Sequence, residues 1–106
     1  MKISIQSVGD LGCVVRASRK AQNVRLDDVA GSAQLSTVFV GDAERGKDSI
    51  QLGKMLRLMH ELGIRMTVEV PDSTQPYWEK IKAQGIRPAR KRPAGKPASI
   101  QEKKSE

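Results

Sequence analysis

The residue types that catalyse reactions or bind metals are scarce in this chain. Its 106 residues include one histidine, His60, and one cysteine, Cys13. A metal site needs several such ligands, and nucleophilic catalysis needs a nucleophile beside a base, and the sequence offers neither grouping. We therefore expect no enzyme activity, no metal and no cofactor, and we interpret His60 and Cys13 as ordinary helix residues.

Positive charge is the chemical property that the chain has in excess. Lys and Arg total 19 against 12 for Asp and Glu, a formal net charge of +7, which favours a polyanionic partner. Residues 1–71 hold ten basic and eight acidic residues, whereas residues 72–106 hold nine and four. The run Arg87-Pro-Ala-Arg-Lys-Arg-Pro fits two interpretations, a solvated tail or a segment in non-specific contact with DNA.

A change of composition marks the end of the folded part. All five prolines lie at Pro71 or later, and the apolar periodicity stops there, so we expect one domain over residues 1–71 and a basic, largely disordered tail over residues 72–106. A short helix is predicted over residues 76–84. It carries Tyr77 and Trp78, and exposed aromatic residues outside a core favour the pocket of a partner. No apolar run is long enough to span a membrane, and a cytoplasmic protein is expected.

Hydrophobic periodicity predicts four helices in the domain. The first begins after the N-cap Asp10 and ends near Asn23, and the second covers residues 26–33. The third begins after the N-cap Ser36 and stops at Gly46, and the fourth covers residues 52–62 and stops at Gly63. In the last helix, one stripe of apolar residues is assigned to the core. Its members are Leu52, Met55, Leu56, Met59 and Leu62.

Alternation replaces helical spacing after Gly63. Apolar residues at every second position, Ile64, Met66, Val68 and Val70, predict a β-strand. A lone strand cannot satisfy its own backbone hydrogen bonds, so it must pair with residues 1–7, with a symmetry mate, or with both. A homodimer closed by a small sheet is the economical solution, and Leu58, which lies off the main helical stripe, is assigned to the same seam.

Two short helices separated by about three residues, with Ala30 near their crossing, are the ingredients of a helix-turn-helix, although inert bundles share this pattern. The segments that add to it are Asn23-Val-Arg-Leu-Asp-Asp-Val-Ala, Leu35-Ser36, Phe39, Glu44-Arg-Gly-Lys and Leu56-Arg-Leu through Leu62-Gly63. Over about residues 10–64 they resemble the phage-repressor-like (Cro/C1, Xre) helix-turn-helix family. The short form that ends in one alternating strand looks like the HipB-type antitoxins, which pair with a kinase-like toxin and repress their own operon.

The resemblance implies a fold, partners and site residues. The fold is a mainly α, lambda-repressor-like bundle of four to five helices. A short C-terminal strand, alone or with a second strand at the N-terminus, forms a sheet in the dimer. Base contacts with operator DNA fall to Ser36, Thr37, Val38, Gly41 and Asp42. Phosphate contacts fall to Arg16, Lys20, Arg25, Arg45 and Lys47. Arg19 and Glu44 occupy the positions of a partly buried ion pair.

Three residues depart from the family pattern. Leu26 replaces a glutamine that would bind phosphate, Gln34 stands where glycine is customary in the turn, and Asp42 brings a negative charge to the reading face. We predict a sequence-specific repressor, nucleoid-associated and bacterial in type, acting as the antitoxin of a type II toxin–antitoxin pair with Tyr77 and Trp78 as toxin contacts. The alternatives are a stand-alone regulator and a protein-binding module that has lost DNA reading.

Overall fold

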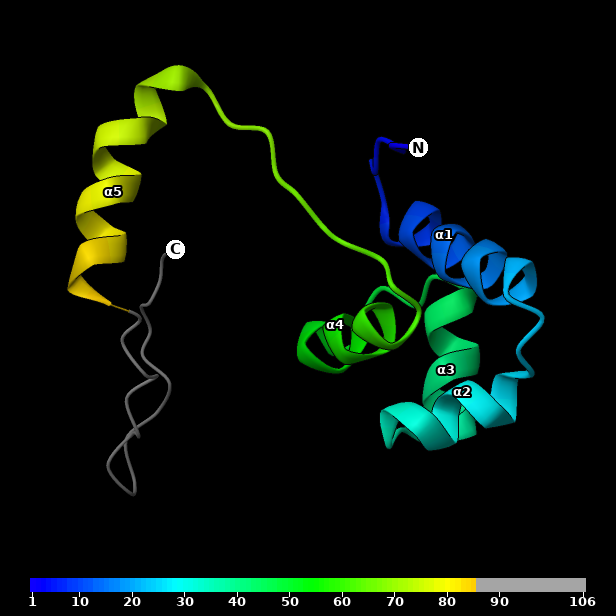
Figure 1. Ribbon diagram of the computed structural model, residues 1–106. Coiled ribbons are helices and arrows are strands. Elements are labelled where there is room, and N and C mark those ends of the chain that lie inside the picture. The colour runs from blue at the N-terminus through cyan, green and yellow to red at the C-terminus, as the bar shows by residue number, and fades with distance from the viewer. Residues whose placement is uncertain (86–106) are drawn as a thin grey trace. The chain divides into compact units, whose positions relative to one another are not determined.

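The computed structural model describes residues 1–85 of the chain. The chain divides into two units, Met1–Thr67 and Val68–Glu106. The first unit holds four helices: α1 (Val8–Ala21), α2 (Leu26–Ala33), α3 (Thr37–Glu44) and α4 (Leu52–Glu61) (Figure 1). Helix α3 packs against both α1 and α2, and α2 also packs against α4. The mainly helical bundle expected from the sequence is therefore confirmed.

The four helices enclose one apolar core made of aliphatic and methionine side chains. Its buried members are Leu11, Val15, Val29, Ala30, Val40, Ala43, Met55, Leu58, Met59 and Leu62. Burial of apolar surface contributes about 25 cal/mol per Å², and helices of eight to fourteen residues are marginal in isolation. The shared core, more than helix propensity, therefore holds these helices in place.

Helix α4 turns a partly different face to the core from the one predicted. Leu52 and Leu56 are exposed, whereas Leu58 is 0% exposed. The buried residues follow the spacing i, i+3, i+4 and i+7 from Met55, and the predicted stripe shares Met55, Met59 and Leu62 with them, so the spacing alone fits either face. The assignment of Leu58 to a dimer seam is wrong, because its side chain is enclosed in the core of its own chain.

Helix α1 begins three residues earlier than predicted. Its N-cap is Ser7 and not Asp10: the Ser7 hydroxyl accepts a hydrogen bond from the Asp10 N–H at 3.0 Å. The Asp10 carboxylate in turn accepts one from the Gln6 N–H at 2.9 Å. This reciprocal arrangement resembles a capping box, and it places the carboxylate in the first turn, where the helix dipole favours negative charge.

All four helices of the first unit end in a residue with left-handed backbone. These residues are Asn23, Gln34, Gly46 and Gly63. At the end of α2, for example, the Gln34 N–H donates to the Gly31 carbonyl at 3.1 Å and the Leu35 N–H donates to the Ala30 carbonyl at 2.8 Å. This is the hydrogen-bond pattern of the Schellman motif, which satisfies the last carbonyls of a helix. The glycine stops were predicted, whereas Asn23 and Gln34 adopt this conformation without being glycine.

In its described part, the second unit consists of a 3-10 turn, η1 (Asp72–Thr74), followed by helix α5 (Gln75–Gln84). Helix α5 falls where a short helix was predicted, while the basic tail from residue 86 onward lies outside the described residues. Residues 1–85 of the single chain form no strand, so the strand over residues 64–70 and its pairing with residues 1–7 or a second copy stay predictions. No helix in this range is long and apolar enough to cross a bilayer.

Candidate nucleic-acid interface

The turn between α2 and α3 sets the direction in which α3 leaves the core. Gln34 lies in the left-handed region with φ 59° and ψ 47°. The chain then becomes extended at Ser36, whose hydroxyl accepts a hydrogen bond from the Phe39 N–H at 3.0 Å and so caps α3. Gln34, which the sequence analysis noted where glycine is customary, thus takes the left-handed conformation that glycine would take more easily.

Arg57 of α4 holds this turn from outside, and the sequence analysis missed it. Its Nη2 donates to the Ala33 carbonyl at 3.1 Å and to the Gln34 carbonyl at 2.8 Å. These two carbonyls lie at the end of α2, where acceptors lack helical partners and the dipole favours a cation. Arg57 stands more than twenty residues away along the chain, so no local pattern could have indicated the contact.

Helix α3 has one face in the core and one in solvent. Val40 and Ala43 are buried, while Thr37 is exposed and Val38 is 69% exposed. An apolar side chain left so open on a short helix is available for contact with a partner, and a valine methyl fits against the methyl group of thymine. Helix α3 therefore exposes the side that carries Thr37 and Val38, two of the residues predicted to contact bases.

The C-terminal end of α3 carries a small charged cluster formed by Asp42, Arg45 and Lys47. Arg45 Nη2 lies 2.8 Å from the Asp42 carboxylate, and Lys47 Nζ lies 3.5 Å from its other oxygen. The structure thus brings together one residue predicted to contact bases and two predicted to contact phosphate. The negative charge that Asp42 adds to the α3 surface is balanced within the protein by two cations.

The other predicted phosphate ligands lie on α1 and at the start of α2. Arg16 and Lys20 are exposed on α1. They follow Gly12, which touches the end of α3, by four and eight residues, so they lie along the side of α1 next to the side that contacts α3. Arg25, at the start of α2, has its Nε 3.3 Å from Asp27 and does not join the cluster. Lys54 of α4, which the sequence analysis did not select, lies 5.9 Å from the ring centre of Phe39 on α3.

Arg19 and Glu44 form the predicted ion pair between α1 and α3. Their side chains are only 12% and 7% exposed, and Arg19 Nη1 also donates to the Val24 carbonyl at 3.0 Å. The hydrogen bond to Glu44 raises the pKa of the Arg19 guanidinium, burial opposes this, and the charge of Glu44 adds to it. A raised arginine pKa stabilises the fold at every pH below the ordinary range of arginine titration. The pair therefore keeps its arginine charged throughout the neutral range.

The residues predicted for dimerisation and toxin binding are divided between the two units. Ile64 is half-buried against the core, and Met66 is exposed. Four others lie on the second unit and are exposed in the single chain: Val68, Val70, Tyr77 and Trp78. Trp78 has Lys82 Nζ 5.4 Å from its ring centre.

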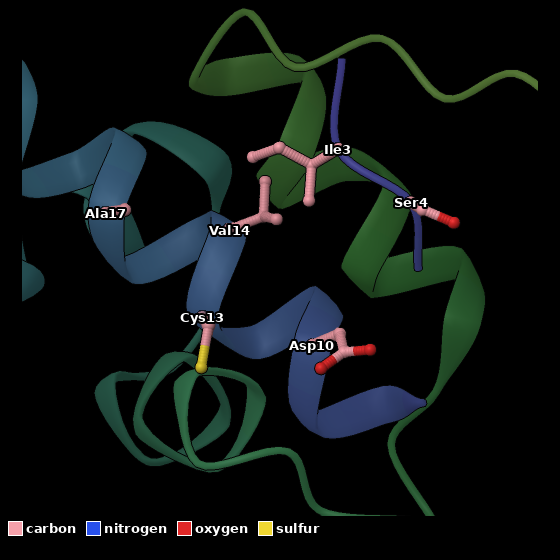
Figure 2. A pocket seen from close by; sticks show the side chains of 6 residues that line it. All are labelled: Ile3, Ser4, Asp10, Cys13, Val14 and Ala17. Atoms are coloured by element: carbon pink, nitrogen blue, oxygen red, sulfur yellow. The ribbon is translucent and has the colours of Figure 1, made fainter. Parts of the chain in front are cut away.

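A hollow on the outer face of α1 offers no catalytic grouping. Its volume is about 310 Å³, and it is lined by Ile3, Ser4, Asp10, Cys13, Val14 and Ala17. Figure 2 shows Ile3 and Val14 turned toward one another across it. Within residues 1–85 no three His, Cys, Asp or Glu side chains are grouped as metal ligands would be.

The capped turn, the outward-facing second helix and the cations at its end define a helix-turn-helix protein. The chain belongs to the HTH-type transcriptional regulators: it is 39% identical over 67 residues to the uncharacterized HTH-type transcriptional regulator y4mF of Sinorhizobium fredii, a match that covers 63% of this chain and 88% of that protein. No protein-family model matches the chain.

Solved structures share the fold. Chains in the structures of a HipA-HipB-O2-O3 complex and of a HipB-O4 20mer complex each align with a TM-score of 0.61 at 16% identity. Each alignment covers 65% of this chain and 97% of the other. The architecture of the phage-repressor-like family that the sequence resembled is thereby confirmed.

Proposed function

We propose that this regulator binds double-stranded DNA by inserting the N-terminal part of α3 into the major groove. The exposed face of α3, with Thr37 and Val38 in its first turn, carries the proposal, because a major groove admits a helix whose first residues reach the base edges. Arg45 and Lys47, just beyond α3, are placed to meet the phosphates that flank the groove. Arg16, Lys20 and Arg25 add positive charge on the neighbouring helices.

A homodimer would give this contact its sequence specificity. Two copies related by a two-fold axis would present their α3 helices one DNA turn, about 34 Å, apart. The exposed apolar residues after α4, Met66, Val68 and Val70, support pairing of residues 64–70 between two copies. Light scattering over a range of protein concentrations tests this pairing, and a monomer at every concentration would contradict it.

The finer proposal is that the protein is the antitoxin of a type II pair and represses its own operon. It is supported by the fold shared with chains of HipB structures, one of which also contains HipA. Tyr77 and Trp78 on α5, exposed outside the helix-turn-helix unit, are the proposed contacts with a kinase-like toxin. Co-purification with the product of the neighbouring reading frame, and its loss in Trp78→Ala, is the direct test.

DNA binding is tested by fluorescence anisotropy with two duplexes, one from the region upstream of the gene and one of random sequence. Arg45→Ala and Lys47→Ala should each weaken binding to both duplexes alike, and each should make the logarithmic salt dependence shallower by about 0.9 for every phosphate that the variant no longer neutralises. Lys80→Ala, which removes the same kind of charge from α5, is the matched control and should change binding less.

Two results would contradict the proposal. If the wild-type protein binds neither duplex at low salt, the helix-turn-helix serves protein binding instead, which was the alternative that Leu26, Gln34 and Asp42 left open. If Arg45→Ala and Lys47→Ala bind as the wild type does while the protein binds DNA, another surface makes the contact.

A further inference from the structure

The acidic residue on the exposed side of α3 is paired with the two cations that we assign to DNA phosphate. Asp42 Oδ1 lies 2.8 Å from Arg45 Nη2, and Asp42 Oδ2 lies 3.5 Å from Lys47 Nζ. In the free protein the carboxylate therefore stands where a phosphate would stand in a complex, with two oxygens that accept from both cations.

The pairing also decides where the Arg45 side chain lies. A Cβ atom at position 41 would be 3.3 Å from Arg45 Nη1, so the guanidinium is folded back against Gly41. Gly41 belongs to the face that would enter the groove, and its missing side chain leaves room for the guanidinium there. While it is paired with Asp42, Arg45 covers part of the reading face and points its charge along α3.

The pairs are open enough to exchange. The Arg45 and Lys47 side chains are 72% and 56% exposed, and exposed ion pairs are weak in water. Phosphates can thus replace Asp42 as partners of both cations. The carboxylate is then left facing the DNA without its cations, and in the major groove it is matched only by a base that presents an amino donor, such as cytosine N4.

We infer that Asp42 is a specificity-determining residue that competes with DNA phosphate for Arg45 and Lys47, lowering affinity for arbitrary sequence more than affinity for a matching site. The inference rests on the proposed entry of α3 into the major groove. On non-matching DNA, release of the cations leaves an unpaired negative charge beside the phosphates. At a matching site the released carboxylate accepts a hydrogen bond from a base.

The test compares Asp42→Asn with Asp48→Asn in anisotropy titrations against the upstream and random-sequence duplexes. Asparagine keeps the size of the side chain and removes its charge. Asp48, one residue from Lys47, is exposed and makes no ion pair within residues 1–85, so its variant measures the general effect of one less negative charge. At low salt, Asp42→Asn should tighten binding to the random duplex about threefold to tenfold, and this tightening should exceed that of Asp48→Asn. The ratio of upstream to random affinity should fall.

Repeating the comparison in a variant that lacks both cations distinguishes competition for the cations from direct repulsion between Asp42 and the DNA phosphates. In the variant carrying Arg45→Ala and Lys47→Ala together, Asp42→Asn should tighten binding to the random duplex less than it does in the wild-type background, because the carboxylate no longer has cations to withhold. Equal tightening in the two backgrounds would overturn the inference, as would an unchanged affinity ratio in the wild-type background. If the wild-type protein binds neither duplex, the proposed function fails and the inference falls with it. If it binds and Asp42→Asn changes nothing, only the inference fails.

Discussion

Single residues decide how α3 is held. Gln34 takes a left-handed conformation that a side chain makes unfavourable, and Arg57 binds the two carbonyls that this turn exposes. The strain was foreseeable, because the sequence places glutamine where the family has glycine. The compensation was not, since Arg57 reaches the turn only after α4 has packed against α2.

Gln34→Gly should stabilise the domain. Glycine adopts φ 59° without the steric cost that a side chain brings, although it loses more backbone entropy on folding, so the net gain in unfolding free energy should be about 0.5–1 kcal/mol. Urea unfolding followed by circular dichroism measures it. Ser32→Gly, in the helical part of α2 and also exposed, should lose a similar amount. A loss of stability in Gln34→Gly would mean that the glutamine side chain itself supports the turn.

At the scale of helices, apolar spacing located all four elements of the first unit but not the contacts between them. Met55 and Met59 belong to two overlapping stripes on α4, so periodicity could not choose the buried face. The sequence analysis assigned no role to Gly12 of α1, yet a Cβ atom there would lie 2.9 Å from the Glu44 carbonyl oxygen and closer still to that of Ala43. The close approach of α1 to the end of α3 depends on this glycine.

Gly12→Ala should therefore destabilise the domain even though alanine favours helices. The methyl group would push against the backbone of α3, and overpacking of this kind costs about 1–3 kcal/mol. Gly31→Ala, on α2 with nothing within 4 Å of the added atom, should gain up to about 1 kcal/mol from helix propensity. Thermal unfolding of the two variants distinguishes them. If Gly12→Ala and Gly31→Ala are equally stable, α1 and α3 can move apart to admit the methyl group without a loss of unfolding free energy.

On the scale of the whole chain, the sequence indicated where apolar patterning ends but not what residues 64–70 do. All the buried apolar residues of the described chain lie between Leu11 and Leu62. The alternation after Gly63 predicts a strand, and a strand needs a second edge with which to exchange hydrogen bonds. Residues 1–85 of the single chain form no strand that supplies such an edge, so pairing of residues 64–70 with a second copy stays a prediction.

A chain ending at Pro71 should unfold almost as the full chain does. It keeps the whole core and the segment predicted to pair between copies, so its thermal midpoint should change by less than about 4 °C, which corresponds to under 1 kcal/mol for a domain of this size. It loses nine basic and four acidic residues, so its binding to upstream and random duplexes should weaken alike and depend less steeply on salt. A fall of the midpoint well beyond this range would mean that residues after Pro71 stabilise the helix-turn-helix unit. Unchanged DNA affinity at low salt would assign the positive charge of the C-terminal segment to another partner.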